Sequence, residues 1–382
     1  MVDTSRVARM KQKGWSMLDS GHAEEAIAAF KECIELDPAN LELKVEFGVV
    51  LYKLNRPDDS LVLLDEVLAA NPNFILALNN KARIMADRHE DKEAMALYKR
   101  ILMIDPNHVR TWVKAAQLMS SREKYTNADS CIVEALKVTP QDPELWRERA
   151  VIARRSGDLD KATEYIDKAL EFKATDFDSL RERANILAAN KKFVDAIETY
   201  KSALHKNPED VECKISLGFA QLAVGRNKDA LDAFEAVFKK DKNNARVWEG
   251  RGLAFIAMGE ASRGLVNRGT AAMIDKQYDE ALKYFDQAIE ANSGYSEAWA
   301  NRGVLLEKME RYDEAANAYR KALELNSNAV VCMHNLGMLC INKLDKREEG
   351  LRWLKTTLKY EPQRWFKLPS DLRSAVDQAN YF

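Results

Sequence analysis

The chain has 382 residues with a formal net charge of −2, and 31% of its residues are charged. Nucleic-acid-binding proteins usually carry a basic excess, so this balance argues against a nucleic-acid partner. No stretch reaches the roughly 18 apolar residues of a membrane span, and residues 1–14 hold no apolar signal-peptide core. The charge balance gives no support for a membrane partner either. Because the five cysteines are widely spaced and odd in number, we expect free thiols and a cytoplasmic location.

Several residue types recur at intervals of 34 positions along the chain. The alanines that keep this spacing are Ala94, Ala128, Ala162, Ala196 and Ala230, preceded two periods earlier by Ala26 and followed by Ala281 and Ala315. The step from Ala230 to Ala281 is 51 residues instead of 34. Prolines, tryptophans and glycines keep the same phase. A repeat of this length is a structural unit that stacks on its neighbours, because one copy alone cannot bury its apolar face.

The apolar pattern inside one interval predicts two helices joined by a turn. In 143–176, Leu145 and Ala150 mark a first helix, Ser156-Gly157-Asp158 interrupts it, and Ala162 with Ile166 marks a second. Each helix should span about 14 residues. The small residues let the two backbones approach closely, and the tryptophans should fill the space between units.

Taken in chain order, the pattern divides the sequence into four parts. The predicted parts are an N-terminal array of seven units over 1–244, an irregular extra helix over 245–261, an array of three units over 262–364, and a capping helix with a tail over 365–382. The segment 262–276 resembles both a first and a second helix of the repeat. The irregularity is either a tolerated half-repeat or a hinge between two binding arrays.

The order of residues in one unit resembles the tetratricopeptide repeat, as in Trp299, Gly303, Ala315, Tyr319 and Ala322. The resemblance covers roughly 7–364. It implies an all-α fold, a right-handed α-solenoid of stacked antiparallel helix pairs with about ten units plus one extra helix. In that family the first helices line a concave groove in which extended peptides bind. The repeat is specific for the fold, and fold alone does not imply function.

The groove position two residues after the tryptophan slot carries an asparagine in several units. Asn80 is the first, and Asn267, Asn301 and Asn335 form an unbroken run. Since an amide side chain offers donors and an acceptor together, a row of asparagines can pair with the main chain of an extended peptide. The alternative is that these asparagines bond to the neighbouring helix and fix the repeat geometry.

The middle units carry charges on their first helices instead. Lys114, Arg147 and Arg181, with Arg110, predict a patch that selects an acidic or mixed-charge partner, because arginine pairs carboxylates in a bidentate manner. The alternative is that the charges form ladders between neighbouring units. No three consecutive units supply the lysine, asparagine and arginine set with which relatives clamp chaperone carboxylates.

No catalytic signature appears in the sequence: we find no phosphate-binding loop, no His-Glu-x-x-His and no Cys-x-x-Cys. We therefore expect no enzymatic activity, no cofactor and no metal site. The predicted function is a scaffold that binds a partner protein or extended peptide in the groove. The alternatives are a homo-oligomer formed by groove-to-end contacts, the regulatory array of an enzyme on another chain, and an RNA-binding repeat. The predicted peptide-binding residues are Asn267, Asn301, Asn335, Asn80, Lys114, Arg147 and Arg181.

Overall fold

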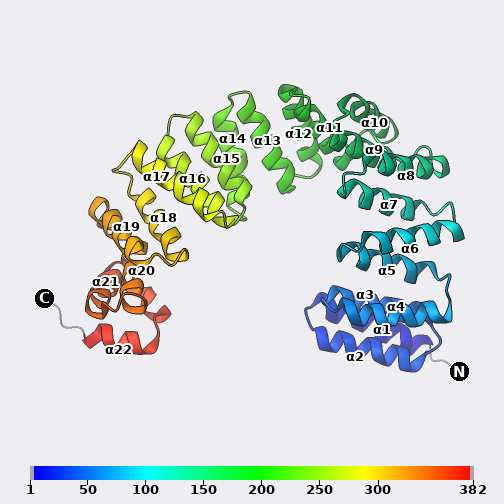
Figure 1. Ribbon diagram of the computed structural model, residues 1–382, viewed down its shortest axis with the longest axis horizontal. Coiled ribbons are helices and arrows are strands. Elements are labelled where there is room, and N and C mark those ends of the chain that lie inside the picture. The colour runs from blue at the N-terminus through cyan, green and yellow to red at the C-terminus, as the bar shows by residue number, and fades with distance from the viewer. Residues whose placement is uncertain (1–3, 379–382) are drawn as a thin grey trace. The chain divides into compact units, whose positions relative to one another are not determined.

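The computed structural model describes residues 4–378, which form helices and turns without a strand. Within residues 4–172, and again within residues 193–378, each helix packs mainly on the helices that precede and follow it in sequence, so that helix pairs stack one after another (Figure 1). This arrangement confirms the predicted all-α solenoid. None of the helices within residues 4–378 combines the length and the hydropathy that a bilayer span requires.

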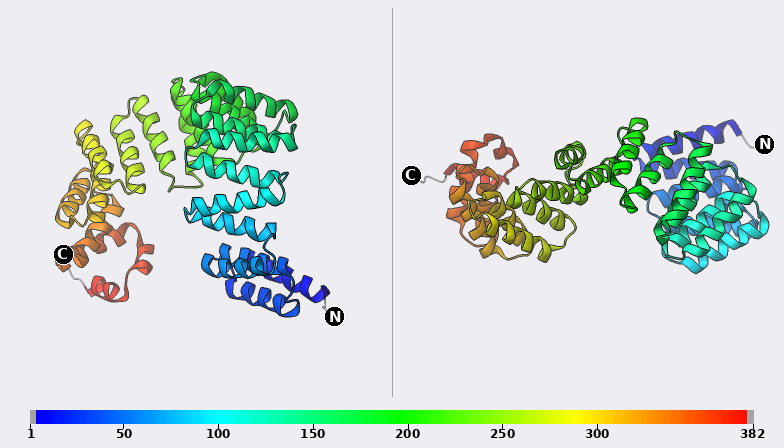
Figure 2. Two further views of the ribbon diagram at one scale, coloured as in Figure 1. Left: turned by 45° about the vertical axis from the view of Figure 1, so that its right-hand side comes forward. Right: turned by 90° about the horizontal axis from the view of Figure 1, so that it is seen from above.

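The chain divides into two compact units, Met1–Glu182 and Arg183–Phe382, and the boundary falls inside α11 (Phe177–Ala189). The first unit contains α1 (Thr4–Asp19), α2 (Ala23–Leu36), α3 (Leu41–Lys53), α4 (Pro57–Ala70), α5 (Ile75–Asp87), α6 (Asp91–Ile104), α7 (Val109–Ser121), α8 (Tyr125–Val138), α9 (Pro143–Ser156) and α10 (Leu159–Phe172). The second contains α12 (Phe193–Lys206), α13 (Val211–Ala223), α14 (Asn227–Phe238), α15 (Ala245–Ala257), α16 (Ala261–Ile274), α17 (Tyr278–Ala291), α18 (Ser296–Lys308), α19 (Tyr312–Leu325), α20 (Val330–Asn342), α21 (Arg347–Tyr360), the 3-10 helix η1 (Pro362–Lys367) and α22 (Ser370–Gln378). Figure 2 gives two further views of these elements.

A residue in the left-handed backbone conformation joins the two helices of each pair. These residues are Gly21, Asn55, His89, Glu123, Gly157, Lys191, Gly225 and Gly259, then Lys276, Glu310 and Asp345. The first eight are spaced by 34 residues, and Lys276 follows Gly259 after 17. The turn geometry thus repeats with the same period as the sequence, whether or not the position holds glycine.

The small residues of the repeat are buried where helices cross. Every alanine of the 34-residue series has 0% exposure: Ala26, Ala94, Ala128, Ala162, Ala196, Ala230, Ala281 and Ala315. Gly303 shows why the first helix also needs a small residue. A Cβ there would lie 2.6 Å from Cε1 of Tyr319, closer than carbon atoms pack. At Gly303 the small residue therefore makes room for an aromatic ring of the second helix, and not for its backbone as predicted.

The tryptophans of the repeat do more than fill space. The indole N–H of Trp112, Trp146, Trp248 and Trp299 donates to the carbonyl six residues earlier, on Pro106, Pro140, Lys242 and Ser293, at 2.9, 2.8, 2.7 and 3.1 Å. Each acceptor lies in the turn between two pairs. The bond therefore ties a first helix to the turn that leads into it, even where that turn lacks proline.

The irregularity centres on α16, which belongs to two pairs at once. It packs on α15, on α17 and also on α18, as a first helix does with the next first helix. Gly264 of α16 and Gly252 of α15 face each other so closely that a Cβ on Gly264 would lie 2.5 Å from the carbonyl oxygen of Gly252. Gly264 stands 34 residues after Ala230 and so occupies the small position of the α15–α16 pair. Whether this region acts as a hinge stays a prediction.

The end of the described chain packs on the last helix pair. Leu372 and Val376 of α22 cluster with Leu351 and Leu354 of α21. Residues 379–382 of the predicted capping helix and tail lie outside the described residues.

Candidate functional site

A polar pocket of about 420 Å³ lies across three successive first helices, α7, α9 and α11, within the first unit. Its lining residues are Gln117, Ser120, Arg147, Glu148, Val151, Arg155, Asp178, Arg181 and Glu182. Three guanidinium groups and three carboxylates therefore face one hollow, which we call the α7–α9–α11 pocket. The arrangement offers hydrogen-bond donors and acceptors of both charges to one ligand.

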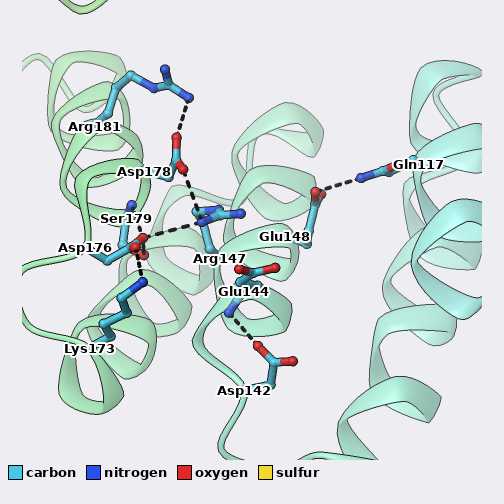
Figure 3. A network of polar contacts seen from close by, with 10 residues as sticks. All are labelled: Gln117, Asp142, Glu144, Arg147, Glu148, Lys173, Asp176, Asp178, Ser179 and Arg181. Carbon is cyan, nitrogen blue, oxygen red and sulfur yellow. Dashed lines mark hydrogen bonds and ion pairs between the residues drawn. The ribbon is translucent and has the colours of Figure 1, made fainter. Parts of the chain in front are cut away.

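Arginine–aspartate pairs connect α9 to α11 along one wall of this pocket (Figure 3). Nη1 of Arg147 lies 3.4 Å from Oδ2 of Asp176 and 3.8 Å from Oδ2 of Asp178. Arg181 donates from Nη2 to Oδ1 of the same Asp178 at 2.9 Å. Two of the predicted site residues thus meet at one carboxylate, and the predicted alternative of charge ladders between units is present here as well.

Asp176 anchors the start of α11. Its Oδ2 accepts hydrogen bonds from the backbone N–H of Ser179 at 3.0 Å and from the Ser179 hydroxyl at 2.8 Å, as a residue capping a helix N-terminus does. Lys173 pairs with Oδ1 at 2.8 Å. Burial by itself would raise the pKa of Asp176, but the hydrogen bonds from Lys173 and Ser179 outweigh it and lower that pKa to about 2. The carboxylate is therefore ionised at all physiological pH values.

The other wall joins α7 to α9 through neutral and charged groups. Lys114 donates to Oε1 of Gln117 at 3.1 Å. Nε2 of Gln117 in turn donates to Oε1 of Glu148 at 2.8 Å (Figure 3). Arg155 lies 3.5 Å from the hydroxyl of Ser120. Within residues 4–378, neither Glu148 nor Arg155 takes part in an ion pair. Two opposite charges of the pocket thus lack a charged partner.

Glu182 behaves differently from Glu148, although both occupy the same position of the repeat. Its side chain is nearly buried, with the residue 7% exposed, and it accepts from Nε and Nη2 of Arg154 at 2.6 and 3.4 Å. This bidentate pair ties α9 to α11 from inside. The carboxylate of Glu182 is therefore engaged in holding the two helices together, and its role in the pocket is structural.

Of the residues predicted for the charged middle units, Arg147 and Arg181 line the pocket, whereas Lys114 does not line it and contacts only its edge through Gln117. The pocket also contains residues that sequence reasoning did not select. Arg155 is the clearest of these. It follows Arg147 by eight residues and Val151 by four, so it lies on the same helix face. Reading every residue of that face, instead of one position of the repeat, would have found it.

The asparagines make local contacts. Nδ2 of Asn80 donates to the carbonyl of Leu76 at 2.8 Å, and Nδ2 of Asn301 donates to that of Glu297 at 3.0 Å, both four residues earlier in the same helix. Asn335 reaches the hydroxyl of Tyr319 at 3.5 Å. These contacts occupy the amide nitrogens and leave the amide oxygens for other donors.

Asn267 differs from the other three in its burial. It is 6% exposed, because α16 is covered by helices on both sides. Its Nδ2 donates to the carbonyl of Arg263 at 2.8 Å, while its Oδ1 is buried without a hydrogen-bond partner. The row of asparagines as a peptide site stays a prediction.

Models of the tetratricopeptide repeat match residues 17–84, 114–179, 187–253 and 296–329, well over half of the chain. A model of the protein prenyltransferase alpha subunit repeat matches 278–309, which covers only α17 and α18. No curated protein matches the chain.

The chain is also similar to proteins with solved structures, of which the first supports the same fold. A tetratricopeptide repeat protein from Parabacteroides merdae is 17% identical, with a TM-score of 0.53 over 66% of this chain and 99% of that one. PilF of Pseudomonas aeruginosa is 16% identical, with a TM-score of 0.46 over 55% and 95%. Human IFIT1, solved as a dimer with m7Gppp-AAAA, is 15% identical, with a TM-score of 0.46 over 93% and 90%. With the family models and the helix pairs already described, the chain belongs to the tetratricopeptide-repeat family, whose fold is typical of protein-interaction scaffolds.

Proposed function

We propose that this protein is a non-enzymatic scaffold that binds an extended segment of a partner protein in the α7–α9–α11 pocket. The observation that supports this most is the presence of two opposite charges, Glu148 and Arg155, that face the pocket without ion-pair partners in the described chain. A charge without a partner costs desolvation energy whenever a ligand covers it, so a ligand that supplies the opposite charge is favoured.

The spacing of these two charges limits the partner. Glu148 and Arg155 are seven residues apart on α9, which corresponds to about 10 Å along a helix. An extended peptide rises by about 3.3 Å per residue. The complementary basic and acidic residues of the partner should therefore lie about two to four positions apart.

Two arginines of the same pocket are held in place by aspartates. Arg147 and Arg181 are held by Asp176 and Asp178, so their guanidinium groups are fixed before a ligand arrives. Fixed side chains lose little conformational entropy on binding, which favours affinity. The remaining N–H groups of Arg147 are suited to backbone carbonyls or carboxylates of the bound segment.

The asparagine row is the second part of the proposal. Since the amide nitrogens of Asn301 and Asn80 bond within their own helices, their amide oxygens are suited to accept backbone N–H groups of a peptide. Asn335 sits in the equivalent position of α20, and its Nδ2 donates to the Tyr319 hydroxyl at 3.5 Å. Asn267 contributes only if α16 exposes its buried oxygen.

Site-specific photo-crosslinking tests where a partner binds. Val151, in the middle of the pocket, is replaced by p-benzoylphenylalanine, and the protein is irradiated in a native lysate. The matched control carries the same residue at Glu164, an exposed position of α10. We expect one partner crosslinked from position 151 and absent from position 164. Equal crosslinking from both positions, or none from 151, contradicts the proposal for this pocket.

Replacing Asn267, Asn301 and Asn335 together by alanine tests the asparagine row separately. The variant is compared with wild type for capture of the crosslinked partner, after equal helicity has been confirmed by circular dichroism. Loss of that partner supports a role for the row. Full retention restricts the site to the pocket, and recovery of this protein alone from the lysate favours self-assembly.

A further inference from the structure

A second pocket lies on a different surface of the first unit, between α6 and the end of α7, with a volume of about 330 Å³. Its lining residues are Asp91, Lys92, Met95, Ala96, Lys99, Leu118, Met119, Arg122 and Lys124. None of these residues lines the α7–α9–α11 pocket. The lining falls into two groups, an apolar floor of methionine, alanine and leucine side chains and a rim of charged ones. We call it the α6–α7 pocket.

The rim of this pocket is strongly basic. Its only carboxylate, Asp91, accepts from Nε and Nη2 of Arg122 at 2.7 and 3.0 Å. The hydrogen bonds from Arg122 lower the pKa of Asp91, so this carboxylate is ionised and committed to Arg122. Lys92, Lys99 and Lys124 take part in no ion pair within residues 4–378. Three ammonium groups therefore line the pocket without an ion-pair partner of their own, because its one carboxylate is paired with Arg122.

The apolar character continues along the outer face of α6. Met103 follows Met95 by eight residues and Lys99 by four, so all three lie on one face of the helix. Met103 is 84% exposed, the highest value among the exposed large hydrophobic side chains of the described residues. Methionine packs adaptably against varied apolar groups, and exposed methionines are common at binding surfaces. Lysine and methionine thus alternate along a single exposed face.

The next repeat provides an internal comparison. An equivalent hollow of about 410 Å³ lies between α8 and α9, lined among others by Thr126, Asp129 and Asp158. These residues stand 34 positions after Lys92, Met95 and Lys124. The α8–α9 hollow keeps the apolar residues Ile152 and Ala153 where the α6–α7 pocket has Leu118 and Met119. The two pockets differ at Met95 of the floor and at Lys92 and Lys124 of the rim, because the next repeat has polar or acidic residues at these positions.

We propose that the α6–α7 pocket binds an acidic segment of a partner protein, which inserts one apolar side chain between flanking carboxylates. The floor of Met95, Leu118 and Met119 accepts the apolar side chain and removes it from water. The three lysines on the rim pair with the carboxylates and give the segment its charge preference. This site is independent of the function proposed for the groove, since the two pockets share no residue.

A library of random dodecapeptides displayed on phage is the first probe. The library is selected on the full-length wild-type protein after depletion on the charge-reversed variant Lys92→Glu/Lys99→Glu. We expect enriched peptides with a leucine, methionine or phenylalanine that has aspartate or glutamate on both sides. A selection without enrichment, or with enriched peptides that lack acidic residues, overturns the proposal.

Fluorescence anisotropy then measures the dissociation constant of the most enriched peptide. Two weak exposed ion pairs contribute little each, but reversing both lysines replaces attraction by repulsion, so we expect Kd to rise about tenfold or more in Lys92→Glu/Lys99→Glu. Met95→Asp, which copies Asp129 of the next repeat, should weaken binding by a similar factor through the floor. The matched control Thr126→Glu places a charge at the equivalent site of the α8–α9 pocket and should leave Kd within about twofold of wild type.

Circular dichroism checks that each variant keeps its helix content. Binding to phosphatidylglycerol vesicles then tests whether the pocket recognises an anionic lipid surface instead of a peptide. Three results together would show that the pocket is an anionic-lipid site and that the proposal is wrong. The wild-type protein would bind the vesicles, Lys92→Glu/Lys99→Glu would not bind them, and the vesicles would displace the peptide from the wild-type protein. Equal weakening by Thr126→Glu also contradicts it, because the effect would then reflect net charge alone.

Discussion

The contact between Gly252 and Gly264 gives a sharp prediction about the α15–α16 pair. In Gly264→Ala the new Cβ would lie 2.5 Å from the carbonyl oxygen of Gly252 and 2.9 Å from the backbone nitrogen of Ile256. Both are backbone atoms of α15 and cannot rotate away as a side chain does. The two helices therefore have to separate, and this disturbs their packing against the neighbouring helices.

The expected size follows from two opposing effects. Overpacking a close contact costs typically 1–3 kcal/mol. Replacing glycine by alanine inside a helix returns about 1 kcal/mol through helix propensity. Because the close contacts include backbone atoms, the upper part of that range applies, about 2–3 kcal/mol, and the net destabilisation should be about 1–2 kcal/mol. It should be confined to the helices that touch the site, because each unit of a repeat protein interacts only with its neighbours.

Amide hydrogen exchange measured residue by residue is the suitable assay, because it reports local opening. In Gly264→Ala, the amides of α15 and α16 should exchange about ten times faster than in wild type, while those of α20 stay unchanged. The matched control is Gly48→Ala, where the nearest atoms to the new Cβ are Ser60 Oγ at 3.3 Å and Leu64 at 3.6 Å. In this control, amide exchange around the substitution should be unchanged or slower than in wild type. Unchanged or slower exchange of α15 and α16 in Gly264→Ala would refute the backbone contact.

Three further predictions concern single residues. Because Asp176 has its pKa lowered to about 2 in the folded protein, its charge stabilises the fold above pH 4 and this contribution is lost as the pH falls toward 2. Asp176→Asn, which keeps the helix cap, should therefore cost about 2 kcal/mol in urea denaturation at pH 7 and almost nothing at pH 2; an equal cost at both values contradicts this. Trp299→Phe removes the hydrogen bond to the Ser293 carbonyl and should cost about 1 kcal/mol by circular dichroism, whereas an unchanged midpoint would show that the bond contributes nothing. Glu310→Gly relieves a positive φ of 60° and should stabilise by up to about 1 kcal/mol in the same assay, and a destabilised variant would contradict the turn geometry.

The fold was predictable because the periodic residues report steric requirements that any unit must meet. Buried Ala162 and Ala196 show this, since a small residue is needed wherever two helices cross. Gly264 was not recognised as the small residue of the second helix in its pair, because we searched this position for alanine, although glycine satisfies the same steric requirement. The hydrogen bonds of the tryptophans were also missed, because a residue type shows bulk but not the direction of an N–H group.

The candidate site was predictable in part. Arg147 and Arg181 stand out in sequence because they recur at equivalent positions, and the structure brings them to one carboxylate. Their partners Asp176 and Asp178 come from the following turn and helix, and pairing across units depends on side-chain directions that a single sequence does not contain. The same holds for Asn267, whose burial results from the double packing of α16.

The most direct test of the proposed groove function is the affinity of the crosslinked partner for wild type and for Glu148→Gln/Arg155→Gln. Neither charge takes part in an ion pair within residues 4–378, so the double substitution leaves the pairs of Arg147, Arg154 and Arg181 in place. The account predicts unchanged helicity and a dissociation constant raised about tenfold or more, as the loss of two complementary charges on binding implies. An unchanged dissociation constant would contradict the α7–α9–α11 pocket as the binding site.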